Sequence, residues 1–407
     1  MIPPHRPAFG LGAVIAAMIA PTARSRDLAK WEAAHADACG VEQAVWLPSG
    51  RAGIGWALKA AIAPDTRVIG PAFTCSVVHE AMVRSGGQPA FVDAAVDSFH
   101  MDAAALTAAR AGANHALVLS EPYGHTYALE DLSEPTLPEP RIRIVDSAMA
   151  VPVPRLFQRL RGNDFAVVSF GAGKNAFAGW GAVGLTRDTA LAEAVRQQRD
   201  RTLWNTSAKL HWKRGLSIGL RTATQHPAVF SATRKLWYWS RTLRHRPTAA
   251  QSATAPGSAG FPPAWSDANQ LSQEWRAPST GVDRQLALRN LATNAANHAR
   301  RLELTARYQE RLRGVSGIRL PPASDFAPSH FTLRVPDGKR DALKAALLER
   351  GVYTINLWAF DTALDPAPFP NTRTLCAEVL NLPLSQWMNP EDVDRVCEGL
   401  LTCLNPA

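Results

Sequence analysis

Short apolar runs alternate with helical patterns through residues 26–200 of this 407-residue chain. Apolar residues three and four positions apart predict helices, whereas short apolar runs bounded by turn residues predict strands. A chain that alternates in this way forms a mostly parallel sheet covered by helices. We therefore expect an α/β fold whose ligands bind at the carboxyl ends of the strands.

The individual elements follow from the same patterns. The expected helices of this region lie within 27–40, 52–63, 76–87 and 103–113. The expected strands lie within 42–50, 67–70, 88–94, 115–124, 142–150 and 164–173, and several of them run into a turn or loop.

The C-terminal part repeats the alternation after a long amphipathic pattern at 291–314, which predicts one helix. Strands are expected within 329–336 and 352–358, and helices within 339–351 and 389–404. We place a domain boundary near residue 290. The expected organisation is a large domain at 1–290, with a basic, tryptophan-rich insertion at about 201–265, and a smaller α/β domain at 291–407.

The apolar segment from Phe9 to Ala20 has the outline of a signal peptide. However, only His5 and Arg6 precede it, two glycines interrupt it, and it is too short to span a bilayer. We expect a helix that is buried or that contacts another subunit.

Charge is concentrated in one segment. The chain carries a net charge of +9, and residues 201–246 hold ten lysines and arginines and no acidic residue, so removing those ten charges leaves −1 for the rest. The basic composition therefore does not indicate a nucleic-acid-binding protein. The five cysteines form no C-x-x-C pair and no histidine cluster has zinc-ligand spacing, so we expect neither a disulfide framework nor a metal site, and a reducing cytoplasm.

The basic segment 201–246 also holds four of the twelve tryptophans. Its second half predicts an amphipathic helix at about 227–246, with apolar residues on one face and arginines and lysines between them. One interpretation is a helix pair packed on the body or on a partner subunit, with a solvated basic face. The other is contact with an anionic membrane surface, which attracts such helices; recognition of a diphosphate in the substrate is a further alternative.

Candidate chemistry centres on Lys174, which lies among glycines in the sequence SFGAGKNAFAGWG (169–181) after an apolar run. A lysine amine can form a Schiff base with the aldehyde of pyridoxal 5′-phosphate (PLP), which also needs a carboxylate at its ring nitrogen and an anion site for its phosphate. Asp146 ends an expected strand and can supply the carboxylate, although a helix N-cap is an equal interpretation. The turn at 49–52 can bind phosphate through backbone N–H groups, and Ser169 can add a hydroxyl or simply bond its own loop.

Two nucleotide motifs are absent. The sequence GAGK lacks the spacing of a P-loop, with Asn175 where serine or threonine is required, and no G-x-G-x-x-G follows the first strand.

Taken in order, six segments resemble the DegT/DnrJ/EryC1/StrS family of PLP-dependent sugar aminotransferases of fold type I. They are LPSGRAGI, DTRVIGPAFTCSVVHEAMVRSGGQPAFVD, VLSEPYGHTYALEDL, IRIVDSAMAV, VVSFGAGKNAFAGWGAVGLT and ARRLELTARYQERL. The resemblance covers most of residues 1–200 and about 290–400. It implies the fold type I architecture, in which a mostly parallel central sheet with flanking helices is followed by a smaller C-terminal α/β domain.

The resemblance also implies roles for individual residues. Lys174 matches the Schiff-base lysine and general base, and Asp146 matches the carboxylate that keeps the ring nitrogen protonated. Ser169 matches a phosphate contact. Ser49, Gly50 and Arg51 match the turn whose amides bind phosphate.

Several positions depart from the family pattern. Cys75 stands where an aromatic residue usually stacks on the ring, and Met149 stands where glutamine is usual. Arg276 falls near the asparagine that a partner subunit contributes, and could contact phosphate by charge. Leu357 and Trp358 replace the usual His-Tyr of the substrate loop, which puts an ordinary nucleotide-sugar substrate in doubt.

We therefore expect a cytoplasmic homodimer that uses PLP to transfer an amino group from an amino acid, with glutamate as the expected donor, to a keto-sugar that is nucleotide-linked or carrier-linked. Relatives that carry histidine in place of this lysine are sugar dehydratases, so Lys174 favours transamination. The alternatives are other fold type I carbanion chemistry, such as dehydration or elimination, and a non-catalytic, membrane-associated scaffold. The membrane interpretation would place the protein at the inner face of the membrane; no nucleic-acid partner and no metal are expected.

Overall fold

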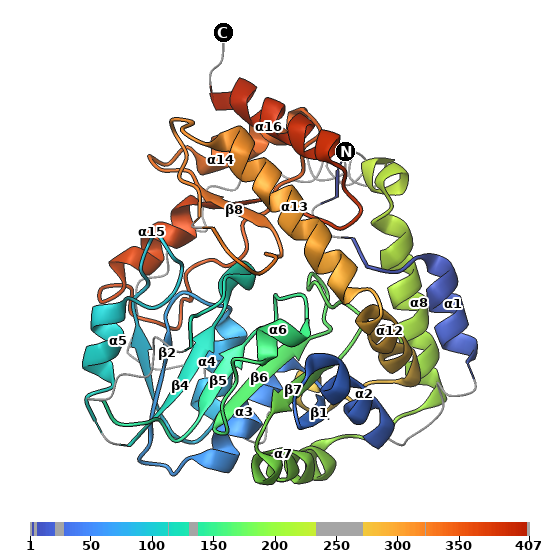
Figure 1. Ribbon diagram of the computed structural model, residues 1–407, viewed down its shortest axis with the longest axis vertical. Coiled ribbons are helices and arrows are strands. Elements are labelled where there is room, and N and C mark those ends of the chain that lie inside the picture. Colours follow the sequence, from blue (N-terminus) through green and yellow to red (C-terminus); the bar gives the residue numbers. More distant parts are fainter. Residues whose placement is uncertain are drawn as a thin grey trace, which may run out of the picture.

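The computed structural model describes residues 2–3, 6–20, 28–112, 114–129, 137–232, 272–321 and 323–404. Within these ranges the chain forms a large sheet covered by helices and a second, two-stranded sheet near the C-terminus (Figure 1).

The large sheet has seven strands in the order β1-β7-β6-β5-β4-β2-β3. Only β7 is reversed, because it pairs antiparallel with both β1 and β6 while the other pairs are parallel. Strand β1 therefore runs in the same direction as β6, and their carboxyl ends lie at one edge. The strands are β1 Gln43–Leu47, β2 Arg67–Pro71, β3 Gln88–Val92, β4 His115–Ser120, β5 Arg143–Asp146, β6 Asp164–Ser169 and β7 Ala182–Thr186.

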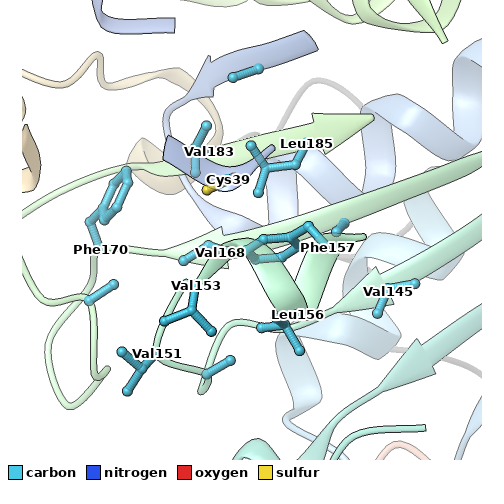
Figure 2. Close-up of a cluster of buried hydrophobic side chains, with 14 of the residues drawn as sticks. Cys39, Val145, Val151, Val153, Leu156, Phe157, Val168, Phe170, Val183 and Leu185 are labelled. Carbon is cyan, nitrogen blue, oxygen red and sulfur yellow. The ribbon is translucent and has the colours of Figure 1, made fainter. Parts of the chain in front are cut away.

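Helices cover both faces of this sheet, and alternate strand residues enter two different hydrophobic clusters. On β1, Trp46 belongs to one cluster and Leu47 to the other. Figure 2 shows part of the first cluster, including Cys39, Phe157 and Val168. The helices up to residue 224 are α1 Leu11–Ile19, α2 Ala29–Cys39, α3 Gly50–Ala61, α4 Ser76–Arg84, α5 Ala103–Ala109, η2 Pro122–Gly124, α6 Pro154–Phe157, α7 Thr189–Thr202 and α8 Ala208–Thr224.

The expected α/β fold is confirmed, and local sequence explains many element ends. Helix α2 stops at Gly40, whose φ of 67° favours glycine. Helix α3 begins after Ser49, whose hydroxyl accepts from the Ala52 N–H, and Asp188 caps α7 in the same way.

The C-terminal part packs around its own cluster of buried residues, which includes Tyr308, Phe331 and Leu400. The domain boundary near residue 290 stays a prediction. The elements are α11 Gln273–Arg276, α12 Gly281–Leu291, α13 Asn294–Leu312, β8 Phe331–Arg334, α14 Arg340–Glu349, α15 Pro370–Glu378, β9 Val379–Leu382 and α16 Pro390–Leu404.

The strand expected at 352–358 is wrong. Only two isolated bridges form there, Val352 with Ile2 and Ile355 with Asn381, and the backbone then turns at Trp358, which has a φ of 62°. A strand needs a continuous ladder of hydrogen bonds to its neighbour. Residues 352–358 pair with other segments at single residues only, so no ladder forms.

Helix α1 is half-buried, because Val14 and Ala17 are buried while Ile15 and Ile19 are exposed. It packs beside α8 (Figure 1). Of the helix expected at 227–246, residues 227–232 are helical and the rest lies outside the described residues. Within the described ranges, no helix is both long enough and apolar enough to cross a bilayer.

Candidate active site

Lys174 lies in the loop after β6 and lines a cavity of about 340 Å³. Its Nζ is 3.1 Å from Sδ of Met149, which follows β5. Because β5 and β6 are neighbours, the residues that follow them meet at one edge of the sheet. The predicted site residues that line this cavity are Ser49, Gly50, Arg51, Cys75, Asp146, Met149, Ser169 and Lys174.

Asp146 ends β5 and contributes its carboxylate to the same cavity. Its Oδ1 accepts from the Ala148 N–H (3.2 Å), and its Oδ2 accepts from the Ser120 hydroxyl (3.3 Å). Burial raises the pKa of Asp146, and the positive charge of Lys174 acts in the opposite direction. The helix-cap interpretation of Asp146 is wrong, because α6 begins only at Pro154.

The N-terminus of α3 forms one wall of the cavity. The first N–H groups of a helix have no acceptor within it. In α3, the N–H groups of Ala52 and Gly53 bond to Ser49, whereas those of Gly50 and Arg51 have no acceptor among the residues that the structure describes. The site therefore offers two backbone donors and the positive end of a 12-residue helix to an anion.

Two hydroxyls of the predicted phosphate site already have hydrogen-bond partners within the protein. Ser49 Oγ donates to the Glu274 carbonyl (2.5 Å), and Ser169 Oγ accepts from the Gly171 N–H (3.3 Å). The interpretation that Ser169 bonds its own loop is therefore supported by this hydrogen bond to Gly171. Since a hydroxyl both donates and accepts, this bond leaves its proton available to a ligand.

Two predicted residues point their charged groups elsewhere. The Arg51 guanidinium bonds to Glu80 (2.6 Å), so its backbone N–H, and not its charge, faces the anion site. Arg276 does not line the cavity of this chain, and its guanidinium lies over the Trp204 ring, 5.1 Å from the centroid. Its role in a partner's site stays a prediction.

Sequence reasoning missed a polar chain behind Asp146. Thr74 Oγ1 donates to Ser120 Oγ (2.8 Å), which in turn donates to Asp146. The adjacent Glu121 also lines the cavity, and its carboxylate accepts from Ser147 and Arg159. Ser120 ends β4, Glu121 follows it, and Thr74 follows β2. These positions were the available signal, because polar residues at several strand ends meet at one edge.

Trp180 was also missed as a cavity residue, whereas Trp358 was expected in the substrate loop; both line the cavity and come from distant parts of the chain. Trp358 stacks on Tyr123, with centroids 4.8 Å apart. Trp180 is held by hydrogen bonds from its N–H to Asp283 (3.0 Å) and from its Nε1 to the Ala277 carbonyl (2.9 Å). These two rings add apolar walls to a cavity that otherwise contains an amine, carboxylates and hydroxyls.

Known structures share this fold over nearly the whole chain. DesV of S. venezuelae matches with a TM-score of 0.68 and 22% identity, covering 99% of this chain and 100% of DesV. The aminotransferase TlmJ of Streptoalloteichus hindustanus matches with a TM-score of 0.69 and 21% identity, covering 99% of both chains. NtdA of Bacillus subtilis, whose structure contains the cofactor PMP, matches with a TM-score of 0.67 and 19% identity over 97% of this chain and 82% of NtdA.

Sequence comparison gives a shorter match to a curated protein and a long match to a family. The erythromycin biosynthesis sensory transduction protein EryC1 of Saccharopolyspora erythraea is 35% identical over 115 residues, which is 25% of this chain and only 31% of that relative. The model of the DegT/DnrJ/EryC1/StrS aminotransferase family matches residues 21–252 and 284–401. The chain therefore belongs to the DegT/DnrJ/EryC1/StrS aminotransferase family.

Proposed function

We propose that this protein is a PLP-dependent aminotransferase that moves an amino group from an amino acid to a keto-sugar. One observation carries the proposal: Asp146, which ends β5, and Lys174, which follows the adjacent β6, line one cavity together with the N-terminus of α3. An amine, a carboxylate and an anion site are the three groups that PLP requires.

The donor set of the cavity fits this cofactor. The N–H groups of Gly50 and Arg51, with the hydroxyl of Ser169, would hold the phosphate. The Ser49 hydroxyl would join them by turning its proton away from the Glu274 carbonyl. Asp146 would pair with the ring nitrogen. Its carboxylate is already oriented by Ser120 and by the Ala148 N–H, so binding needs little rearrangement.

Cys75 and Met149 would lie against the ring. Cys75 precedes α4 and lines the cavity, as does Met149, so the two sulfur-bearing side chains take the places that an aromatic ring and an amide usually hold in the family. Sulfur is polarizable and packs well against aromatic rings. We therefore expect the cofactor to be held without aromatic stacking from position 75.

The chain's own residues supply the proton transfer. When bound, PLP supplies an aldehyde that condenses with amines and a protonated ring that accepts electrons. Lys174 Nζ would bind the aldehyde carbon before the donor arrives, and would then take a proton from the α-carbon of the donor and deliver it to the carbon that receives the amine. Trp180 and Trp358 reduce the access of water to this amine.

The finer parts of the proposal concern substrate and assembly. We infer that glutamate is the donor, that the acceptor is a nucleotide-linked or carrier-linked keto-sugar, and that the protein works as a homodimer in the cytoplasm or at the inner face of the membrane. In the dimer, Arg276 would reach the phosphate site of the partner subunit. The family membership supports a small-molecule substrate.

The first test is cofactor binding. PLP added to the purified protein is expected to give a visible absorption band that borohydride fixes to the peptide containing Lys174. Lys174→Ala is expected to abolish the fixed band, whereas Lys59→Ala, on the exposed end of α3, is a matched control that should retain it. A band that survives Lys174→Ala unchanged would refute the assignment.

The second test follows the nitrogen. Incubation with ¹⁵N-glutamate and a panel of keto-sugars is expected to give a ¹⁵N-labelled amino-sugar and 2-oxoglutarate. Only transamination transfers the label, so a sugar product without ¹⁵N would indicate dehydration or elimination instead. A stable absorption band with no reaction on any amino donor would indicate a non-catalytic protein.

A further inference from the structure

Helices α1 and α8 form a tightly packed antiparallel pair at the side of the molecule (Figure 1). The Met18 carbonyl, near the end of α1, lies 3.1 Å from Nε2 of His211, near the start of α8. At the other end, Leu11 lies next to Gly219. An added Cβ atom at Gly215 would overlap Met18, so this glycine allows the close approach of the two helices.

The outer side of this pair is apolar. Leu11, Ile15 and Ile19 recur every four residues on α1 and are 47%, 53% and 69% exposed. On α8, Trp212, Leu216 and Leu220 recur at the same spacing and are 47%, 66% and 68% exposed. These six side chains, which we call the α1/α8 face, are six of the nine large hydrophobic residues exposed in the described ranges.

Both helices bury their other sides. Val14 and Ala17 of α1, and Ile218 of α8, belong to the buried part of the molecule. The exposed rows are therefore the outer sides of two helices whose inner sides are already packed. Because α1 contains no charged or polar side chain, its exposed side has no group that favours water.

Two lysines of α8 lie beside this face. Lys209 and Lys213 are exposed on α8, and the sequence from 201 to 266 contains no acidic residue. The acidic residue that shares a cavity with Trp212 is Asp200, and it is already paired with Arg199 (2.7 Å). The α1/α8 face thus combines apolar ridges with unopposed lysines.

We propose that the α1/α8 face binds the surface of an anionic phospholipid bilayer. The six apolar side chains would enter the boundary between headgroups and acyl chains, while Lys209 and Lys213 would contact the lipid phosphates. Both helices would lie parallel to the bilayer plane. A helix of nine residues cannot span the membrane, but it can lie in the interface.

Charge favours a bilayer over a second copy of this face. In a symmetric dimer the same patch meets itself, so the interface would gather Lys209 and Lys213 of both copies, and residues 201–266 supply no acidic side chain to pair with them. An anionic lipid surface pairs with the same lysines favourably. The basic residues of 233–246 continue this charge along the sequence.

The test is flotation of the full chain, loaded with PLP, on phosphatidylcholine vesicles with and without phosphatidylglycerol. We expect binding only to the anionic vesicles, and weaker binding as salt is raised. Lys209→Glu with Lys213→Glu is expected to weaken binding on the order of thirtyfold or more. Leu216→Glu with Leu220→Glu is expected to abolish it.

Lys339→Glu with Arg373→Glu is the matched control, since it makes the same charge change at exposed positions away from α1 and α8. It should bind vesicles as the wild type does, and the PLP absorption band should be unchanged in all three double variants. Absence of wild-type binding at low salt would overturn the proposal. An equal loss of vesicle binding in the control variant would also overturn it. A wild-type protein that never binds vesicles, and whose dimer is lost in the Leu216/Leu220 variant, would do the same by showing that the face joins two subunits. Binding that survives both face variants and is lost only when 233–271 is deleted would overturn it as well.

Discussion

Arg214 of α8 and Asp283 of α12 form a buried ion pair (2.9 Å) next to the loop that carries Lys174. The Arg214 guanidinium lies 4.6 Å from the centroid of the Trp180 ring, and Asp283 also accepts from the Trp180 N–H. Burial raises the pKa of Asp283 and lowers that of Arg214, so each charge depends on the other. One wall of the candidate active site is therefore fixed by a contact between two distant helices.

Arg214→Ala should lower the free energy of unfolding by about 3–5 kcal/mol, because it leaves the buried Asp283 carboxylate without its cation. Denaturant unfolding of the PLP-free protein measures this change. Lys209→Ala, on the exposed side of the same helix, should change the free energy by less than about 0.5 kcal/mol. Equal effects of the two variants would show that the ion pair has no special role.

Gly179→Ala should destabilise the protein by roughly 2–5 kcal/mol and weaken PLP binding. Gly179 has a φ of 118°, and an added Cβ would overlap Asp283 Oδ1 and Ile218 Cδ1. Gly86→Ala isolates the backbone effect, since Gly86 has a φ of 89° and open space around it, so a loss of about 1–2 kcal/mol is expected there. Unfolding curves and PLP titrations of both variants make the comparison.

Ser169→Ala should weaken PLP binding by about tenfold or more, because it removes a hydrogen bond to a charged phosphate. Arg51→Ala should change it much less, since the Arg51 guanidinium is bonded to Glu80 and the backbone N–H remains. Spectroscopic titration with PLP compares the two. A larger loss in Arg51→Ala would mean that the arginine charge turns toward the cofactor.

Asp146→Asn should have opposite effects on the empty and the loaded protein. Because the folded-state pKa of Asp146 is raised, its contribution to stability is present below its unfolded pKa and is lost as pH rises through the folded value. Asparagine does not ionise, so the variant does not lose stability in this way as pH rises. Near neutral pH the PLP-free variant should therefore unfold no more easily than the PLP-free wild type. PLP should nevertheless dissociate more readily, because the ring nitrogen loses its anionic partner.

Stability should fall as pH is lowered below about 6.5, because buried histidines are neutral in the folded protein. Burial lowers the pKa of His35 and of His125 to about 4, and that of His330 to about 3. Each unfolded histidine binds a proton that its folded form does not, which reduces the free energy of unfolding by about 1.4 kcal/mol per pH unit. His35→Gln should reduce this slope by one such contribution, as measured by unfolding at several pH values.

The alternation of apolar runs and helices was enough to predict the α/β fold and most elements of the large sheet. It also predicted that Ser49, Asp146 and Ser169 lie at strand ends, where residues from different strands meet. These features depend on local periodicity. A strand buries every second residue and a helix every third to fourth, so the pattern can be seen in residues that are neighbours in the sequence.

Tertiary structure alone decided the reversal of β7, the absence of a strand at 352–358 and the pairing of Arg214 with Asp283. It also decided that the Arg51 side chain turns to Glu80 and that one side of α1 stays uncovered. Such features depend on which surfaces meet across the fold. Whether a charged side chain has an ion-pair partner, and whether an apolar face is covered, depends on which distant residues the packing of helices brings together. A local sequence pattern contains no information about those contacts.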